Sequence, residues 1–327
     1  MRHARAREVT RGRAAPAAPA ALALTAALLM GSAAAAFGVP LSDVPAAFVD
    51  VGVGAGPMGM AGAVVAGAAG AEAVFWNPAS VGRGAAGREF IASYCDQMGL
   101  VPYSAASGAV ALGPEYALGV GVLFSGDDVL AEVTGIAALA RTAPAPPWCR
   151  GRPSHVGVAL RGRWASYGNN DSTDAQVTGD ALGGGLDLGV VVPLTTSLTL
   201  GVAGRDLANT LSWDSSAAGS YGEGVPAALV MGIAADPRPG LRIEVDLDKA
   251  LRADNGDMAA AGASLSIAGI ATLRAGYRRA LPPDEFEEYA VGCGAAVPTG
   301  HGRIALDVAY LFGRLEDTLR LTVGLRF

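Results

Sequence analysis

The last eleven residues of the chain, Asp317 to Phe327, read D-T-L-R-L-T-V-G-L-R-F. Successive side chains of a β-strand point to opposite faces, so the large apolar residues fall on one face here, and threonines, arginines and a glycine on the other. A tilted strand of about 9–11 residues crosses the hydrocarbon core of a bilayer. The stretch therefore predicts a membrane-spanning strand, and its closing aromatic, Phe327, is predicted to be the signal for insertion of a β-barrel.

The same alternation recurs along the chain. Between Leu241 and Lys249, four aliphatic residues alternate with Arg242, Glu244, Asp246 and Asp248, a charged row that must face water or ionic partners. We expect fourteen strands, an even number as closed single-chain barrels require. They lie near 88–95, 105–113, 116–125, 129–140, 154–164, 183–192, 197–206, 226–235, 241–249, 258–267, 270–278, 288–297, 302–312 and 317–327.

The first 36 residues have the layout of a secretory signal peptide. Five arginines precede an apolar stretch from Ala20 to Met30, and three alanines end at Ala36, near which we expect cleavage. Removal of these arginines and of Glu8 takes the formal charge from −6 to −10. An acidic exported chain argues against nucleic acid as a partner, and we expect the mature protein in a bacterial outer membrane, in contact with its lipid and as a monomer.

Other classes of function find little support. Past the signal peptide no apolar run reaches the roughly 18 residues of a spanning helix. The three cysteines, Cys95, Cys149 and Cys293, form no metal or redox motif, and which of them could pair is open. The mature chain keeps only two histidines, and no serine lies in a nucleophile elbow. We therefore expect no enzyme, no bound metal and no cofactor.

Residues 37–86 differ from the strands that follow. They are rich in glycine and alanine, too small for a lipid-facing strand and too apolar for a solvated tail. A barrel of about 14 strands has a lumen that must be filled if it is not to leak. We expect an all-β chain in which the hatch, 37–86, plugs the lumen of a transmembrane β-barrel formed by 87–327. The hatch or gate residues are Gly59, Gly62, Phe75, Trp76, Asn77 and Pro78.

Inward-facing charges of both signs are expected to line the lumen. Two roles are open for them: an ion-pair and water network that holds the plug, or a lining that selects solutes. The predicted lumen charges are Arg161, Arg163, Asp187, Arg205, Arg242, Glu244, Asp246, Asp248, Arg274, Asp307, Arg320 and Arg326.

Two motifs carry a resemblance to a known family. The stretch from Gly56 to Ala63, G-P-M-G-M-A-G-A, and the later Phe75 to Ala79, F-W-N-P-A, resemble the N-terminal signature of the PorV/PorQ proteins and of the broader FadL-like outer-membrane barrels. The segment Gly185 to Gly189, G-L-D-L-G, and the closing Phe327 also match. The resemblance covers nearly the whole mature chain and implies a 14-stranded barrel with an N-terminal hatch.

This resemblance implies two functions. FadL-like members pass fatty acids or other hydrophobic small molecules through a hatch-gated lumen, which would make such a compound the ligand. PorV and PorQ serve type IX protein secretion, which would make the chain a non-conducting anchor for secreted proteins. Such a partner would dock on the outer loops predicted at 165–182 and 207–225. The sequence identifies neither a ligand nor a cargo.

Overall fold

The computed structural model describes residues 48, 51–83, 87–97, 99–127, 129–148, 151–168, 177–251, 256–282, 286–314 and 316–327. The predicted signal peptide, both ends of the predicted hatch, Cys149 and the middle of the predicted loop 165–182 lie outside these residues. Of the other cysteines, Cys95 and Cys293 are free thiols.

Within the part of the chain that the structure describes, fifteen strands form one sheet. They are β1 (Arg88–Gln97), β2 (Val101–Ala111), β3 (Tyr116–Gly126), β4 (Leu130–Ala143), β5 (Ser154–Tyr167), β6 (Gly179–Pro193), β7 (Leu198–Ser215), β8 (Gly219–Glu223), β9 (Ala228–Arg238), β10 (Leu241–Ala250), β11 (Met258–Ile267), β12 (Ala271–Ala280), β13 (Glu287–Thr299), β14 (Gly302–Gly313) and β15 (Thr318–Arg326).

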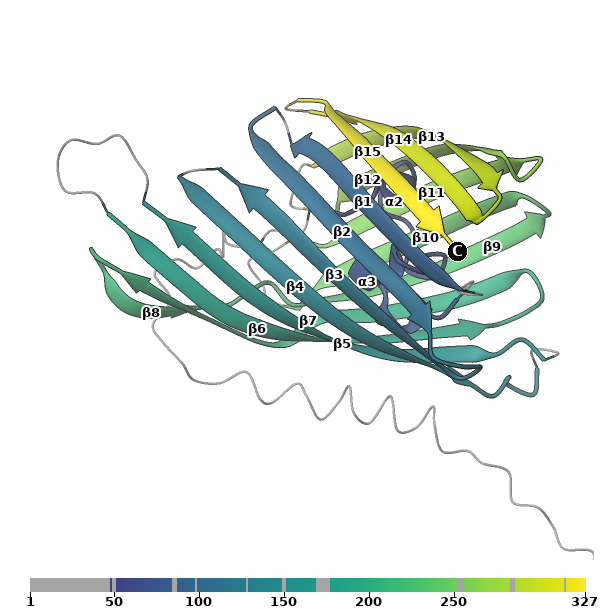
Figure 1. Ribbon diagram of the computed structural model, residues 1–327, viewed down its shortest axis with the longest axis horizontal. Coiled ribbons are helices and arrows are strands. Elements are labelled where there is room, and N and C mark those ends of the chain that lie inside the picture. The colour runs from purple at the N-terminus through teal and green to yellow at the C-terminus, as the bar shows by residue number, and fades with distance from the viewer. Residues whose placement is uncertain are drawn as a thin grey trace, which may run out of the picture. The chain divides into compact units, whose positions relative to one another are not determined.

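The sheet closes on itself into a barrel. Consecutive strands pair antiparallel except for β8 and β9, β6 pairs with β7, and β1 pairs with β15 from Glu89 opposite Arg326 to Cys95 opposite Arg320 (Figure 1). Strand β7 is longer than its neighbours and pairs with β9 along its first part and with β8 along its last part. Fourteen strands therefore complete the ring, and β8 is a short addition to it. The predicted all-β, 14-stranded antiparallel barrel is confirmed.

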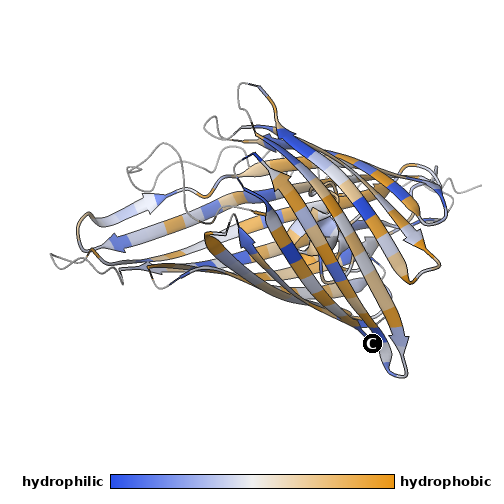
Figure 2. Cartoon of the chain, turned by 90° about the horizontal axis from the view of Figure 1, so that it is seen from above, coloured by the Kyte–Doolittle hydropathy of each residue, from blue (hydrophilic) through white to orange (hydrophobic). Residues whose placement is uncertain are grey.

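Alternate faces of each strand meet different surroundings. In β15, Arg320 and Thr322 are each 2% exposed, whereas Leu321 and Val323 are 40% and 45% exposed. Strand β10 behaves likewise, with Glu244 buried and Val245 exposed. The hydropathy of successive residues alternates along many strands (Figure 2). The apolar face therefore points outward, as lipid requires. Among the described residues, no helix has the length and apolar character to cross a membrane.

The two ends of the barrel differ in their connections. One end carries the start of β1, the C-terminal Phe327 and turns such as 194–197, 239–240 and 300–301; we call it the short-turn end. The opposite end carries the connections 251–257 and 281–286. One prediction for that end is wrong: 207–225 is not a loop, because β7 continues to Ser215 and β8 follows. Strands β2 and β6 also begin four residues earlier than predicted.

The part of the chain that precedes the barrel is compact. Segment 51–83 contains the short helices α2 (Ala55–Met58) and α3 (Ala73–Trp76) and the 3₁₀ turn η2 (Pro78–Ser80). Helix α2 contacts β13, β14 and β15, while α3 contacts β2, β3 and β4. The segment thus lies within the ring of strands (Figure 1).

Candidate functional site in the lumen

The inward face of the barrel is in contact with segment 51–83 along much of its length. Among the predicted hatch residues, Gly59, Phe75, Trp76, Asn77 and Pro78 are buried and Gly62 is half-buried. Apolar side chains of the segment and of the wall form one cluster that includes Met58, Val74, Ile91 and Ile136. The structure therefore brings all six residues together inside the barrel.

Glycines of the wall let the segment approach the strands. A Cβ atom added at Gly276 would lie 2.6 Å from the backbone nitrogen of Ala61, and one added at Gly201 would lie 2.6 Å from that of Ala66. Both distances are far below van der Waals contact. Eight strands carry such glycines, namely Gly119 and Gly121 on β3, Gly157 on β5, Gly189 on β6, Gly201 on β7, Gly232 on β9, Gly262 on β11, Gly276 on β12 and Gly292 on β13.

The Trp76-Asn77-Pro78 motif fastens the segment to itself and to the wall. The indole nitrogen of Trp76 donates to Val53 O at 2.9 Å. Asn77 is fully buried; its Nδ2 donates to Val65 O at 2.8 Å and to Val202 O on β7 at 3.4 Å, and its Oδ1 accepts from Ala79 N. Pro78 occupies the first position of η2, where a missing N–H costs nothing. The motif thus closes a turn rather than binding a ligand.

Two carboxylates of β10 bind the backbone of the segment. Asp246 Oδ2 accepts from the N–H groups of residues 64 and 65, at 2.7 and 2.9 Å. Glu244 Oε1 accepts from those of residues 66 and 67, at 2.6 and 3.1 Å. Both side chains are buried. Carboxyl oxygens of the wall thus accept from four consecutive N–H groups that no helix or strand satisfies.

Arginines of the wall bind carbonyl groups of the same segment. Arg320 donates to Gly52 O at 2.7 Å and to Val51 O at 2.8 Å, and Arg242 donates to Gly67 O at 3.0 Å. Arg205 lies over the Trp76 ring at 5.3 Å from its centre and donates to Trp76 O. The cationic side chains therefore satisfy carbonyl groups on two sides of the segment.

The remaining predicted lumen charges are placed as follows. Arg274 pairs with Asp307 at 2.6 Å, and Arg326 pairs with Glu89 at 3.0 Å near the short-turn end. Asp248 is half-buried near the opposite end of β10. Arg161, Arg163 and Asp187 belong to a separate network. The charges do not form one site but line the lumen at several levels.

One carboxyl group within the segment is strongly perturbed. Glu72 lies beside Gly54 and Gly56, and Arg274 is the nearest wall cation. A small part of the Glu72 surface is accessible to solvent, but protein atoms surround its carboxyl group at longer range. This burial, together with the negative charges of Asp307 and Glu89, raises the pKa of Glu72 to about 7. Arg274 and Arg326 oppose the shift only in part.

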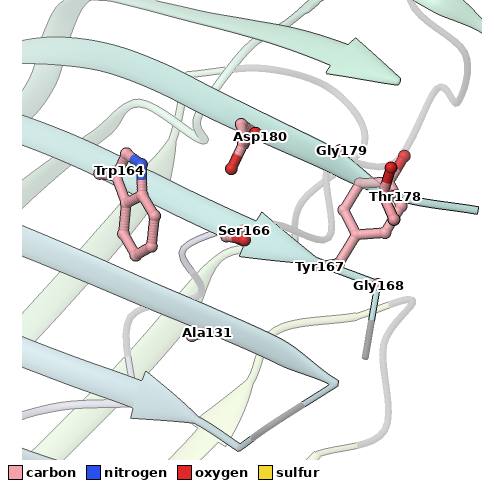
Figure 3. A pocket seen from close by; sticks show the side chains of 8 residues that line it. All are labelled: Ala131, Trp164, Ser166, Tyr167, Gly168, Thr178, Gly179 and Asp180. Atoms are coloured by element: carbon pink, nitrogen blue, oxygen red, sulfur yellow. The ribbon is translucent and has the colours of Figure 1, made fainter. Parts of the chain in front are cut away.

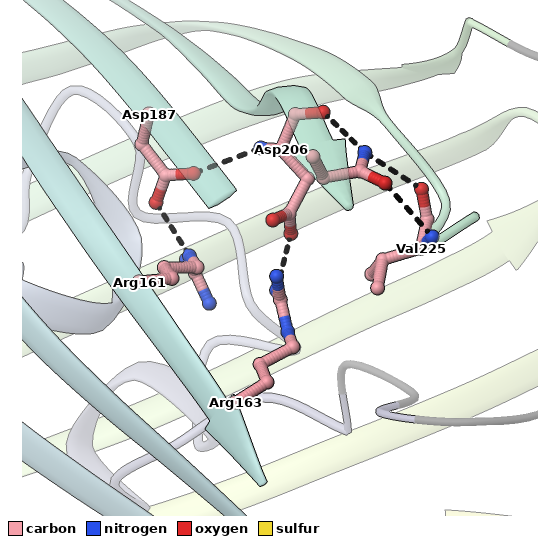
Figure 4. A network of polar contacts seen from close by, with 6 residues as sticks. Arg161, Arg163, Asp187, Asp206 and Val225 are labelled. Carbon is pink, nitrogen blue, oxygen red and sulfur yellow. Dashed lines mark hydrogen bonds and ion pairs between the residues drawn. The ribbon is translucent and has the colours of Figure 1, made fainter. Parts of the chain in front are cut away.

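An ionic network interrupts strand β7 (Figure 4). Arg161 Nε donates to Asp187 Oδ2 and Arg163 donates to Asp206 Oδ2, both at 2.7 Å, and Asp187 Oδ1 accepts from Asp206 N at 2.8 Å. Asp206 has a φ of 49°, an uncommon value for a non-glycine residue. Here three residues of β7 oppose the single residue Asp187 of β6. The network holds this bulge in place.

The side chain of Asn209 bridges the interruption on the other side of β7. Its Nδ2 donates to Val225 O at 3.0 Å, and its Oδ1 accepts from Val225 N at 3.0 Å. Between Glu223 and Ala228 the chain has no ladder pairing with β7. Asn209 therefore substitutes for backbone pairing at that point of the wall.

An apolar cluster lies beyond this network, toward the end opposite the short-turn end. It occupies the face of β5 to β8 on which Arg163 lies, and Phe48, preceding segment 51–83, contacts both the cluster and the Arg163 guanidinium. Trp213 stacks on Tyr221 at 6.3 Å and contacts Tyr167 at 5.7 Å between ring centres. We call this set the outer apolar cluster: Phe48, Ala165, Tyr167, Ala181, Leu211, Trp213, Tyr221 and Val225.

Two pockets lie at the ends of the barrel. One, of about 360 Å³, lies between the ends of β5 and β6 (Figure 3). Its Trp164 and Ser166 are on the face of β5 opposite to Arg163, so it opens away from the lumen. The second, of about 580 Å³, lies at the short-turn end beside Arg238 and Arg242. Among the described residues, no group of three histidine, cysteine or acidic side chains could hold a metal ion.

Comparison with known proteins adds information on the fold. No protein-family model and no curated protein sequence matches the chain. Similar solved structures include the CymD monoaromatic hydrocarbon channel, with a TM-score of 0.56 and 17% identity over 84% of this chain and 96% of that one. The chain has the fold of such barrels.

Two further solved structures have a similar fold. The Pseudomonas putida toluene transporter TodX gives a TM-score of 0.55 at 15% identity, with 84% of this chain and 97% of that one covered. A Pseudomonas aeruginosa FadL homologue gives 0.57 at 12% identity, with 90% and 100% covered. None of these structures is a PorV or PorQ protein, so the resemblance to PorV/PorQ rests on sequence motifs alone. The FadL-like barrel is the part that the fold supports.

Several residues of the lumen site were not predicted from the sequence. They are Asp206, Glu89 and the wall glycines; Thr322 was predicted to face the lumen, but its contact with segment 51–83 was not. Thr322 Oγ1 accepts from Ala55 N at 2.8 Å, and Glu89 accepts from Ala71 N at 3.2 Å. The inward position of Thr322 and Glu89 in their strands was available as a signal, because both alternate with apolar residues. The bulge at Asp206 left no comparable signal.

Proposed function

We propose that the chain is a channel for hydrophobic small molecules in a bacterial outer membrane, where it acts as a monomer embedded in lipid. The short-turn end faces the periplasm in this proposal, because outer-membrane barrels have their short turns on that side. Segment 51–83, with the rest of the predicted hatch 37–86, is the plug of the lumen. The fold of three barrels described as hydrocarbon channels or FadL homologues supports the proposal.

The outer apolar cluster is the observation that carries it. The inward face of a water-filled barrel is polar, yet here three aromatic rings and four aliphatic side chains gather on that face above a network of four charges. Binding sites for small molecules combine such apolar surfaces with a few placed polar groups. We infer that a hydrophobic ligand entering from outside first contacts this cluster.

Uptake by whole cells tests the proposal. The chain would be produced in a host that lacks its own hydrophobic-compound channels, and the uptake of labelled toluene and labelled oleate would be compared with that of the empty host. We expect a several-fold increase for at least one of them. Trp213→Ala should remove much of the increase, whereas Trp164→Ala, at the same end on the outward face, should not. Uptake equal to that of the empty host for both compounds would contradict the proposal.

A second experiment asks whether the plug moves. Ala55 N and Thr322 Oγ1 are 2.8 Å apart, so a disulfide formed by Ala55→Cys with Thr322→Cys, in a chain whose native cysteines are serines, would tie segment 51–83 to β15. If segment 51–83 must move to open the lumen, oxidation should lower uptake and a reductant should restore it. Equal uptake in both states would mean that the route passes beside a stationary plug.

The alternative role in protein secretion gains no support. The proposed docking loop 207–225 is strand β7 and the hairpin that it forms with β8, and none of the similar solved structures named above is a secretion protein of the PorV or PorQ type. No described feature of the chain favours a secreted-protein partner over a small molecule.

A further inference from the structure

The two ends of the barrel carry opposite charge. Each end of the barrel consists of the connections at that end and the three nearest residues of every strand. Among the described positions, the short-turn end has eight arginines and three acidic residues. The opposite end has twelve acidic and five basic residues on the same count. The basic end is notable because the mature chain as a whole is acidic. Charged surfaces of this kind steer the approach of partners with the opposite charge.

Most of the basic charge at the short-turn end is not neutralised. Three of its arginines pair with the three acidic residues: Arg141 with Glu115, Arg242 with Asp236 and Arg326 with Glu89. The other five form no ion pair with a carboxylate in the described part of the chain; they are Arg83, Arg88, Arg152, Arg238 and Arg303. Burial lowers the pKa of Arg83 to about 10, and the positive charges of Arg242 and Arg152 act in the same direction.

The longest connection at this end presents a tryptophan. The sequence from Pro144 to Trp148 is P-A-P-P-W, and Trp148 is 64% exposed. Three prolines restrict the backbone of the connection, so less entropy is lost when it is bound. Tryptophan and arginine are the residues most enriched in the energetically dominant parts of interfaces. An exposed tryptophan at the end of the barrel that carries five unpaired arginines therefore has the composition of a binding surface.

The connection between β4 and β5 contacts the β6–β7 turn, which lines the pocket of about 580 Å³ at the short-turn end. Arg152 donates to the carbonyl oxygens of Thr195 and Thr196, at 3.0 and 2.8 Å, which fixes it against the β6–β7 turn. Thr196 also lines the 580 Å³ cavity, together with Arg238 and Ser264. Lipid head groups reach only the outer surface of the wall, whereas Arg83 donates to Ala66 O of segment 51–83 and so lies at the mouth of the lumen. The occupant should therefore be a molecule that approaches along the barrel axis.

We propose that the surface formed by Trp148, Arg152 and the cavity at Arg238 is a docking site for an acidic segment of a periplasmic protein. The inference depends on the proposed function in one respect, because that function places the short-turn end in the periplasm. Glutamate or aspartate side chains of the partner meet the unpaired arginines, and one of its apolar side chains packs on Trp148. A protein docked here would lie where a compound leaves or enters the lumen.

Peptide binding to the purified full-length barrel in discs of zwitterionic lipid tests the proposal. The probe is a fluorescent peptide, Glu-Glu-Leu-Glu-Glu-Leu-Glu-Glu, and its control has glutamine at every glutamate. We expect binding of the acidic peptide alone, weakening as salt increases. Arg238→Gln should lower the affinity about two- to fivefold, the range for one partly exposed ion pair. Trp148→Ala should lower it about tenfold or more.

The controls distinguish docking at this site from attraction of the peptide to arginines elsewhere on the barrel. Arg279→Gln removes an exposed arginine from the opposite end and should leave the affinity unchanged. The side chain of Arg238 forms no hydrogen bond with the described part of the chain, so Arg238→Gln should not disturb the fold. Equal binding of the glutamine peptide, or an equal effect of Arg279→Gln, would overturn the proposal. So would binding of the acidic peptide that neither Arg238→Gln nor Trp148→Ala weakens. Hydrocarbon uptake is measured separately, so either proposal can fail without the other.

Discussion

The close fit between the wall glycines and segment 51–83 predicts that a single methyl group will destabilise the barrel. In Gly276→Ala, the new Cβ would lie 2.6 Å from both Ala61 N and Met60 O, so the segment would have to move by about an ångström. It cannot move sideways along the wall, because Gly262, opposite Gly276 in the ladder, is in equally close contact with Met60. Overpacking of a filled core costs about 1–3 kcal/mol, and we expect the upper half of that range.

The matched control is Gly162→Ala on β5. A Cβ added at Gly162 would meet no atom within 4 Å, so its free energy of unfolding should stay within about 0.5 kcal/mol of the original, as for an ordinary surface change. Unfolding by urea in lipid vesicles, followed by tryptophan fluorescence and by the heat-dependent shift in gel mobility, measures both. If the two variants unfold at the same urea concentration, the segment is not held against the wall and our account of the lumen is wrong.

Three further changes test other contacts. Asp246→Ala leaves two buried N–H groups of the segment without an acceptor and should lower the free energy of unfolding by about 2–6 kcal/mol, at about 1–3 kcal/mol for each group. An unchanged urea midpoint would show that Asp246 does not hold the segment. Glu72 has a higher pKa in the folded state, so the folded barrel binds the extra proton and loses stability as pH rises from about 4.5 to 7. Glu72→Gln should therefore stabilise at pH 8 and have little effect at pH 4; the reverse order would contradict the burial of this carboxyl. Val323→Asp puts a charge on the outward face and should reduce the amount of folded barrel in membranes, whereas normal yield would mean that this face is not in lipid.

The barrel was predictable because lipid imposes a regular pattern on each strand. Strands such as β10 and β15 alternate between large apolar and charged residues, and both the number of strands and their faces follow from this. The pattern fails in β7 beyond Ala208, where polar residues point outward and Leu211 and Trp213 point inward. That inversion is expected of a strand that extends past the membrane, since its outer face then meets water. A search for lipid-facing strands therefore reads it as a loop.

The contents of the lumen were predictable only in part. Buried charged residues such as Glu244 and Arg320 were identified because a charged side chain in a membrane-spanning strand must face the lumen rather than lipid. The partners of these charges were not, since they are backbone groups of segment 51–83, which any sequence provides. Gly276 and the other wall glycines carry no hydropathy signal of their own. Their role depends on a second piece of chain that lies against them in space.

The seam between β1 and β15 constrains the order in which the chain can assemble. Arg320, on the last strand, binds the carbonyls at the beginning of segment 51–83, and it lies opposite Cys95 in that seam. The segment also contacts strands all around the ring, so it could not thread into a cylinder that had already closed. Pairing of the first and last strands must therefore be a late event that happens around an occupied interior. A nascent chain that stalls before β15 would be an open sheet curled around its own N-terminal segment.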